Sequence, residues 1–208
     1  MAVNYIVQAS VVDIRSDIPI PSDSFFVDTN VWYWMTYNRA SHAARPPMKY
    51  QIESYPDYIA KAITINSKLN QCGLSLAELA HIIERTEHEI FNNSQAVKVS
   101  TKEYRHNTQL ERDKVVSEIR AAWGQVATMS SIIETNIDND AICDLLIKLQ
   151  NHPLDGYDLY MLDTIQRSGI MQIITDDGDF ATVPNIQLFT ANYNVLTAAS
   201  KQGKLVKR

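Results

Sequence analysis

The chain lacks the sequence signatures of several common enzyme classes. Its six glycines among 208 residues form neither a G-x-x-x-x-G-K loop nor a G-x-G-x-x-G run, which argues against nucleotide-driven and dinucleotide chemistry. It also has no G-x-S-x-G segment and no cysteine near a histidine, so a covalent enzyme intermediate is not expected. Any hydrolysis would therefore use water as the attacking group.

Cysteine, long apolar segments and positive charge are also scarce. The two cysteines, Cys72 and Cys143, fit neither a metal site nor a disulfide framework, which is typical of a reducing compartment such as the cytoplasm. No stretch approaches the roughly 18 apolar residues of a membrane span, and the N-terminus has no basic leader. The net charge of −5 gives no overall attraction to nucleic acid, so a polyanionic substrate would need local basic residues or a metal ion.

What is present is an alternation of apolar and amphipathic segments that predicts an α/β fold. Strands are expected at residues 24–29, 129–135, 171–175 and 186–190, and helices at residues 31–36, 57–69, 75–91, 100–122, 141–150 and 157–167. Strands separated by helices indicate a mostly parallel sheet covered on both faces. We expect one domain at residues 24–195, an N-terminal extension at 1–23 and a basic C-terminal tail at 196–208, mobile from residue 201 onward.

Acidic residues stand at four widely spaced positions in this pattern. Two of the positions lie where an apolar strand ends, and two lie where an amphipathic helix begins. The residues are Asp28 in FFVDTN, Glu78 in LSLAEL, Asp158 in LDGYDLYML, and Asp176, Asp177 and Asp179 in IITDDGDF. An open α/β sheet gathers such places along one edge. Carboxylates meeting there would repel one another unless a divalent cation such as Mg²⁺ or Mn²⁺ lay between them, so the pattern indicates metal-dependent chemistry.

Each acidic position also has a purely structural interpretation. Asp28 could simply cap the helix that follows it, and Glu78 could close a capping box with Ser75. For these two residues neither interpretation is favoured. Asp158 shares a helix face with apolar residues, where a merely solubilising acid is not expected. Three acids crowded at residues 176–179 would need a counterion, so this cluster and Asp158 favour a functional site.

The combination of segments resembles the PIN-domain nucleases over residues 24–192. Four segments carry the resemblance in this order: FFVDTNVW, LSLAELAHII, DLYMLDTIQRSG and IITDDGDF. The resemblance implies a three-layer α/β/α fold and a ribonuclease that depends on Mg²⁺ or Mn²⁺. It further implies a catalytic, metal-binding quartet of Asp28, Glu78, Asp158 and Asp177, with supporting roles for Asn30, Thr175 and Asp179. Asp176 is the alternative to Asp177, because the TDDGD segment has one acid more than the family pattern needs.

Many small PIN domains are toxins of toxin–antitoxin pairs, so the resemblance implies an RNA substrate and suggests an antitoxin protein as a partner, with a homo-oligomer as a further candidate. In such an enzyme a metal-activated water would attack the phosphodiester. Two alternatives stay open. One is a PIN-like binding or scaffold module without catalysis, which a complete quartet disfavours. The other is a structure-specific DNA nuclease, which the same chemistry allows.

Basic residues that could position RNA form two groups. Lys102 and Arg105 belong to a helical stretch of mixed charge at residues 98–120, for which a solvated face is the commoner explanation. Arg39 and Arg45 follow the first expected helix, close to tyrosines. Aromatic and basic side chains together suit single-stranded RNA, so both groups are candidate substrate contacts.

Overall fold

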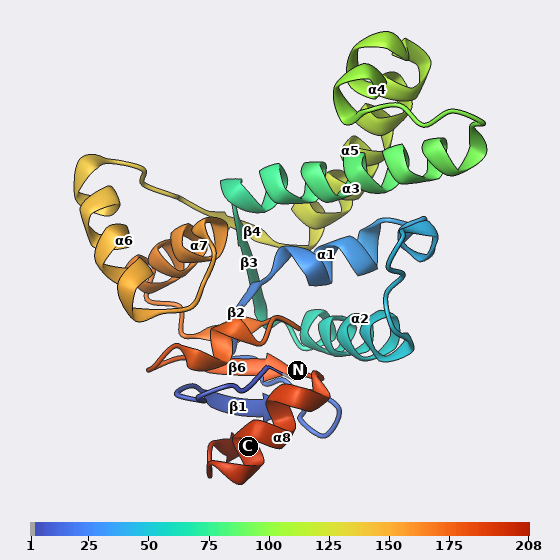
Figure 1. Ribbon diagram of the computed structural model, residues 1–208. Coiled ribbons are helices and arrows are strands. Elements are labelled where there is room, and N and C mark those ends of the chain that lie inside the picture. Colours follow the sequence, from blue (N-terminus) through green and yellow to red (C-terminus); the bar gives the residue numbers. More distant parts are fainter. Residues whose placement is uncertain (1–2) are drawn as a thin grey trace.

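The computed structural model describes residues 3–208, and its centre is a seven-stranded parallel sheet (Figure 1). The strands are β1 (Ser10–Asp13), β2 (Ser24–Val27), β3 (Lys68–Cys72), β4 (Ser131–Ile133), β5 (Gln172–Ile174), β6 (Gln187–Thr190) and β7 (Leu205–Val206). Their spatial order is β4-β3-β2-β5-β6-β1-β7, and every neighbouring pair is parallel. The expected α/β/α class with a parallel central sheet is therefore confirmed.

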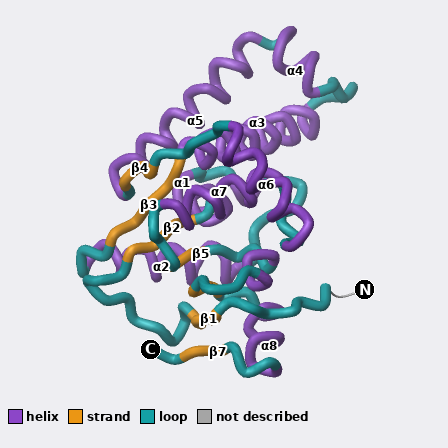
Figure 2. The backbone as a smooth tube through the Cα atoms, turned by 90° about the vertical axis from the view of Figure 1, so that its left-hand side faces the viewer, coloured by secondary structure: helices purple, strands orange, loops and turns teal. Residues whose placement is uncertain are grey.

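Helices cover both faces of this sheet. They are α1 (Thr29–Thr36), α2 (Lys49–Thr64), α3 (Gly73–Ser94), α4 (Thr101–Asn107), α5 (Gln109–Met129), α6 (Asn139–Asn151), α7 (Gly156–Arg167) and α8 (Tyr193–Lys201), with short 3-10 helices η1 (Ala40–His42) and η2 (Asp179–Thr182). Helices α1, α2, α3 and α5 pack on one face, and α6, α7 and α8 pack on the other. The long α3 and α5, together with α4, extend beyond the sheet (Figure 2). Within residues 3–208, none of the helices combines the length and apolar character needed to cross a membrane.

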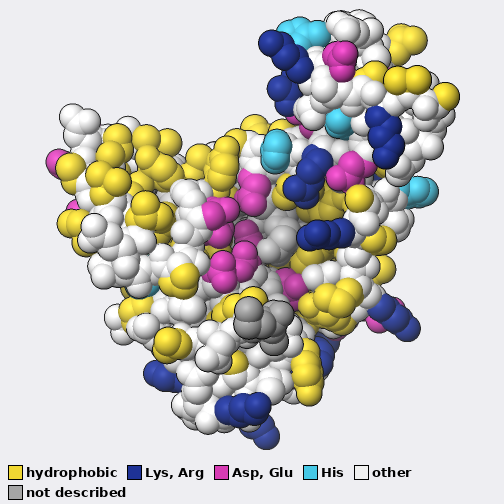
Figure 3. All heavy atoms as spheres, viewed as in Figure 1, with side chains coloured by type: hydrophobic (Ala, Val, Ile, Leu, Met, Phe, Trp, Pro, Cys, Tyr) yellow, Lys and Arg dark blue, Asp and Glu magenta, His cyan; other side chains and the backbone are white. Residues whose placement is uncertain are grey.

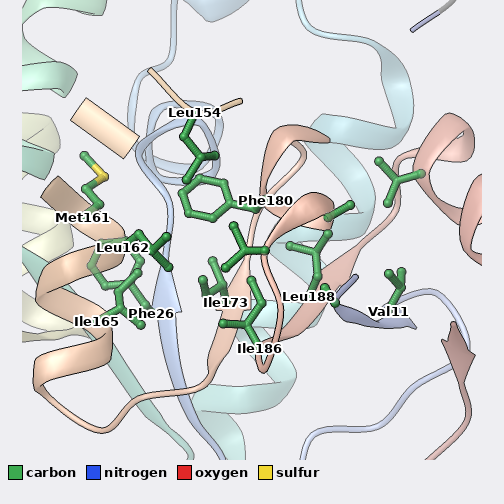
Figure 4. Packing of buried hydrophobic residues seen from close by; sticks show 14 of the residues in the cluster. Val11, Phe26, Leu154, Met161, Leu162, Ile165, Ile173, Phe180, Ile186 and Leu188 are labelled. Atoms are coloured by element: carbon green, nitrogen blue, oxygen red, sulfur yellow. The ribbon is translucent and has the colours of Figure 1, made fainter. Parts of the chain in front are cut away.

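The strands build a separate core on each face because their side chains alternate. In β2, Phe25 and Val27 face the α1 side, whereas Phe26 faces the α7 side, and all three are fully buried. Figure 4 shows Phe26 among residues of α7 and β5 such as Leu162 and Ile173. Full burial of each such side chain stabilises the fold by about 1.5–3 kcal/mol. Burial on both faces also explains the continuous apolar run in the sequence.

The region between α1 and α3 departs from the sequence prediction. A helix was expected only from residue 57, but α2 begins at Lys49 and contains Pro56. Burial of Tyr55 and Tyr58 stabilises the helix and offsets the cost of the hydrogen bond that is lost because proline has no N–H donor. Helix α2 ends at Thr64, and β3 follows it. No apolar pattern indicated β3, because its buried Asn70 is polar and donates a hydrogen bond to the Phe25 carbonyl oxygen (2.9 Å).

Both terminal segments belong to the sheet layer. β1, in the expected N-terminal extension, pairs with β6, and β7, in the expected C-terminal tail, pairs with β1. Arg208 donates hydrogen bonds to Asp17 and Asp23 at 2.6 and 2.7 Å, and its guanidinium lies 4.6 Å from the centre of the Phe189 ring. The expectation of a mobile tail from residue 201 is therefore wrong, because these ion pairs and β7 hold the segment in place.

The strand order creates a crevice between β2 and β5. The chain leaves β2 towards β3 on one side, and it leaves β5 towards β6 on the other. Connections that diverge from adjacent parallel strands open a crevice at their carboxyl ends, which is where ligands bind in open α/β sheets. Because α3 follows β3 and α7 precedes β5, the first turns of both helices lie at the same edge.

Candidate acidic site

Asp28 lies at the centre of this crevice, between β2 and α1. Its Oδ1 caps α1 by accepting a hydrogen bond from the Thr29 amide (2.7 Å). Its Oδ2 accepts from the Thr175 hydroxyl (2.5 Å), which follows β5, and from the Asn30 side-chain amide (2.5 Å). The capping interpretation is therefore confirmed, and it leaves Oδ2 free of this task, so it does not exclude a role of Asp28 in a functional site.

Glu78 comes from the second turn of α3. The helix begins at Gly73, two residues before the expected Ser75, and the Ser75 hydroxyl accepts from the Cys72 amide (3.3 Å). The alternative that Glu78 closes a capping box with Ser75 is therefore wrong, because Ser75 is not the cap. The Glu78 Oε2 is buried and has no hydrogen-bond partner among residues 3–208. An unpartnered buried carboxylate oxygen is costly unless water or a cation meets it.

Asp158 projects from the first turn of α7. The preceding Asp155 caps this helix, since its carboxylate accepts from the Asp158 amide (3.0 Å). The capping function therefore falls on Asp155, and the Asp158 carboxylate is not needed for it. Asp158 is only 9% exposed, and no Lys, Arg or His side chain in the described part of the chain forms an ion pair with it.

The TDDGD segment directs its first two acids to different neighbours. Asp176 accepts hydrogen bonds from three side chains of α2: Tyr50 (3.1 Å), Gln51 (2.6 Å) and Tyr55 (2.7 Å). Asp177 instead lies near the other three acids of the expected quartet, whose pKa values its charge raises. The Asp179 amide fixes Asp177 Oδ1 (2.9 Å). The geometry therefore favours Asp177 for the site and gives Asp176 the role of linking β5 to α2.

Burial and like charge raise the pKa values of the acids in the crevice. Burial, followed by the charge of Glu78, raises the pKa of Asp28 to about 7, although the Thr175 hydrogen bond opposes the shift. Burial and the charges of Asp28 and Asp155 raise the pKa of Asp158 to about 9. The pKa of Glu78 is raised for similar reasons. At neutral pH the site therefore retains protons unless a cation compensates the charge.

The residues fit a divalent cation by their chemistry more than by their spacing. Among residues 3–208, no three Asp, Glu, His or Cys side chains converge closely enough to hold a metal ion. The charges of these acids nevertheless interact strongly. In addition to Glu78 Oε2, the buried Asn30 Oδ1 lacks a hydrogen-bond partner within the described residues. Carboxylate and amide oxygens are the ligands that Mg²⁺ and Mn²⁺ prefer. An ion would have to draw these side chains together, and relief of their repulsion favours that movement.

Of the residues expected to contact RNA, two arginines are already paired with buried glutamates. Arg39 is held by the buried Glu87 (2.7 Å), and Arg105 is held by the buried Glu84 (2.5 Å). These arginines tie α3 to η1 and to α4, which is a structural task. Lys102 is exposed on α4.

Arg45 differs from those residues because it lines a cavity between the loop after η1 and helix α3. The same cavity is lined by Arg85 of α3, a residue that the sequence analysis did not single out. A signal was present, since Arg85 stands seven residues after Glu78 and therefore lies on the same face of α3. Figure 3 shows the acids gathered in a hollow of the surface, with Lys and Arg side chains along its α3 side.

The N-terminal segment adds Tyr5 to the rim of the site. The Tyr5 ring packs so closely on Gly178 that a Cβ there would lie 2.3 Å from the ring. Burial, followed by the charges of Asp179 and Asp177, raises the pKa of the Tyr5 hydroxyl. Only the glycine of TDDGD allows this approach. Sequence patterns could not reveal the contact, because its partners are separated by most of the chain.

Comparison with known proteins assigns no family. No protein-family model matches the chain, and a search of curated proteins finds no match. The chemistry of the site and the segments that carry the resemblance are therefore the basis for assigning a function.

Proposed function

We propose that this protein is a metal-dependent nuclease that hydrolyses RNA phosphodiester bonds with Mg²⁺ or Mn²⁺. One observation carries the proposal: Asp28, Glu78, Asp158 and Asp177 lie at the switch point of a parallel sheet, close enough to raise one another's pKa values, and no ion pair within residues 3–208 involves any of them. Buried carboxylates in such surroundings are candidates for a functional site. The resemblance to PIN-domain nucleases supports the same reaction class and the choice of RNA.

In this proposal the four carboxylates hold the ion, and neighbouring groups orient them. A bound Mg²⁺ or Mn²⁺ lowers the pKa of a coordinated water and neutralises charge on the scissile phosphate. The Thr175 hydroxyl and the Asn30 amide both donate to Asp28 Oδ2 and fix its direction. The Thr175 hydroxyl also accepts from the Asp177 amide (2.8 Å), so one side chain positions two members of the quartet.

A cleavage assay with matched variants tests this function. Purified protein is incubated with labelled single-stranded RNA, or DNA of the same sequence, in Mn²⁺, in Mg²⁺ and in EDTA. We expect metal-dependent cleavage of RNA that Asp158→Asn lowers more than about a hundredfold, since loss of a ligand should exceed the 10–100-fold cost of losing an outer-shell partner. Asp163→Asn, on the same helix but paired with Lys148 and Arg167, is the control and should stay within about threefold, because Asp163 is not a proposed metal ligand.

Four results would contradict the proposal in different ways. Cleavage that persists fully in EDTA would exclude metal dependence. Full activity of Asp158→Asn would remove Asp158 from the site. Preferential cleavage of DNA would leave the chemistry in place and make the RNA assignment wrong. Absence of cleavage in every condition would favour the alternative of a binding or scaffold module.

The toxin role implied by the resemblance has its own test. A nuclease that attacks cellular RNA should arrest the growth of a bacterial host when it is expressed alone, and Asp28→Ala should relieve the arrest. An antitoxin partner would be expected to restore growth when both are expressed. Harmless expression of a folded, active enzyme would contradict the toxin role while leaving the nuclease function intact.

A further inference from the structure

We propose that Arg45 and Arg85 form a phosphate-binding subsite for a nucleic-acid strand whose neighbouring phosphate lies at the acidic site; the nature of this ligand rests on the proposed nuclease function. The two arginines line a cavity of about 320 Å³ between the loop that follows η1 and helix α3. That volume lies within the range of small-molecule sites.

Both guanidinium groups are available to a ligand. Arg45 and Arg85 are exposed, and neither forms an ion pair or a side-chain hydrogen bond within residues 3–208. Arg39, Arg105 and Arg112 nearby are all paired with buried glutamates. The two cavity arginines therefore carry charge that the protein itself does not use.

The loop that bears Arg45 is fastened to α3. Glu89 lines the same cavity, and its Oε2 accepts a hydrogen bond from the Ala44 amide (2.8 Å). This contact places Arg45 beside Arg85, and Glu89 is occupied by the backbone instead of by either arginine. With two positive charges against one negative charge, the cavity favours an anion. A guanidinium offers paired donors that match phosphate oxygens.

The spacing along α3 relates this cavity to the acids. Arg85 follows Glu78 by seven residues, which places it about 10 Å further along the axis and within about 20° of the same face. Because none of the four quartet residues lines this cavity, the phosphate at Arg85 is not the one at the quartet. The cavity therefore fits a phosphate further along the same strand, and Figure 3 shows basic side chains on this side of the acidic hollow.

A binding experiment without metal tests the subsite separately from cleavage. The affinity of labelled single-stranded RNA is measured by fluorescence anisotropy in EDTA at several salt concentrations, for the wild type and for Arg45→Ala/Arg85→Ala. We expect the double variant to bind at least about tenfold more weakly and to lower the salt-dependence slope by about 0.7, because the two arginines neutralise one phosphate and each single-stranded phosphate contributes about 0.7. Its melting temperature should be unchanged, because neither arginine supports another residue.

The control is Lys68→Ala/Lys201→Ala, which removes the same charge at exposed positions on the opposite edge of the sheet. This variant should bind RNA like the wild type. Equal losses in both double variants, or none in the arginine variant, would overturn the subsite. DNA of the same sequence should show the same loss as RNA, since the phosphate is common to both, and a loss confined to RNA would also overturn phosphate recognition.

Turnover distinguishes failure of this inference from failure of the proposed function. In the nuclease assay, Arg45→Ala/Arg85→Ala should raise KM and leave kcat almost unchanged. Arginine-dependent binding by a wild type that never cleaves would sustain the subsite and refute the nuclease. Cleavage with an unaltered KM and unaltered binding in the double variant would refute the subsite and sustain the nuclease.

Discussion

Helix α7 carries two buried aspartates in opposite electrostatic surroundings. Asp163 accepts hydrogen bonds from Lys148 (2.7 Å) and Arg167 (2.6 Å). Burial alone would raise its pKa, but these two cations outweigh burial and lower the pKa. Asp158, five residues earlier at the crevice, has no such partner among the described residues, and burial together with neighbouring acids raises its pKa to about 9.

Helix α3 repeats the same contrast. Hydrogen bonds from Arg105, supported by the charge of Arg112, lower the pKa of Glu84. Burial and nearby acids raise the pKa of Glu78, which lies in the same helix closer to the crevice. Within residues 3–208, the buried acids away from the switch point are paired with Lys or Arg, whereas the acids at the switch point are not. Carboxylates without a cationic partner destabilise the fold when no ion is bound, and they are suited to binding an ion.

The largest expected effect separates two adjacent acids of the TDDGD segment. Asp177→Asn should lower cleavage more than about a hundredfold, because it removes a proposed metal ligand. Asp176→Asn should act mainly on stability, since Asp176 accepts from three side chains of α2. Both are measured as kcat on RNA and as denaturant unfolding. Loss of activity in Asp176→Asn at unchanged stability would reverse the assignment of the two residues.

The second prediction compares the two aspartates of α7 by their effect on stability. In EDTA, Asp163→Asn should lower the free energy of unfolding by about 1–3 kcal/mol, because it breaks charge-assisted hydrogen bonds. Asp158→Asn should raise the free energy of unfolding, because at pH 7 the folded protein holds a proton on Asp158 that the unfolded chain releases, and asparagine removes this cost of folding. Urea unfolding at pH 7 measures both. Destabilisation by Asp158→Asn as large as that of Asp163→Asn would show that Asp158 has a structural role.

The third prediction concerns pH. Asp28 and Asp158 have folded-state pKa values of about 7 and about 9, above the unfolded value of about 3.9. Above pH 4 the folded protein thus binds more protons than the unfolded chain. The stability that these two carboxyl groups contribute is therefore fully present below pH 4 and is lost as the pH rises through 7 and 9. The melting temperature in EDTA should fall between pH 6 and 9, and Mn²⁺ should flatten the fall. An identical fall in Asp158→Asn would contradict the assignment.

The smallest expected effects concern the helix that sequence patterns suggested for RNA. Lys102→Ala should change RNA affinity less than about twofold, because Lys102 is exposed and lies on α4, outside the acidic hollow. Arg105→Ala should cost about 0.5–1 kcal/mol of stability through its half-exposed pair with Glu84. A salt-dependence slope lowered by about 0.7 in Lys102→Ala would restore α4 as an RNA contact.

Sequence patterns could predict the acidic residues because each is tied to a local signal. Asp28 directly follows an apolar strand, and Asp158 lies in a helix start that a preceding Asp caps. The resemblance implied Asp177 and left Asp176 as the alternative, and local patterns could not decide between them, since the choice depends on donors of α2 more than 120 residues away. β3 was missed because its buried amides satisfy their hydrogen bonds through the tertiary structure, which apolar periodicity does not detect.

The most direct test of the uncompensated acidic site is calorimetric titration with Mn²⁺. Wild type, Asp158→Asn and Asp163→Asn are titrated at pH 7 in buffers of different ionisation enthalpy, which reports proton release. We expect saturable binding with proton release for the wild type and for Asp163→Asn, and affinity at least about tenfold weaker for Asp158→Asn. Equal Mn²⁺ affinity in Asp158→Asn and the wild type, or no binding at millimolar Mn²⁺, would contradict a divalent cation at this site.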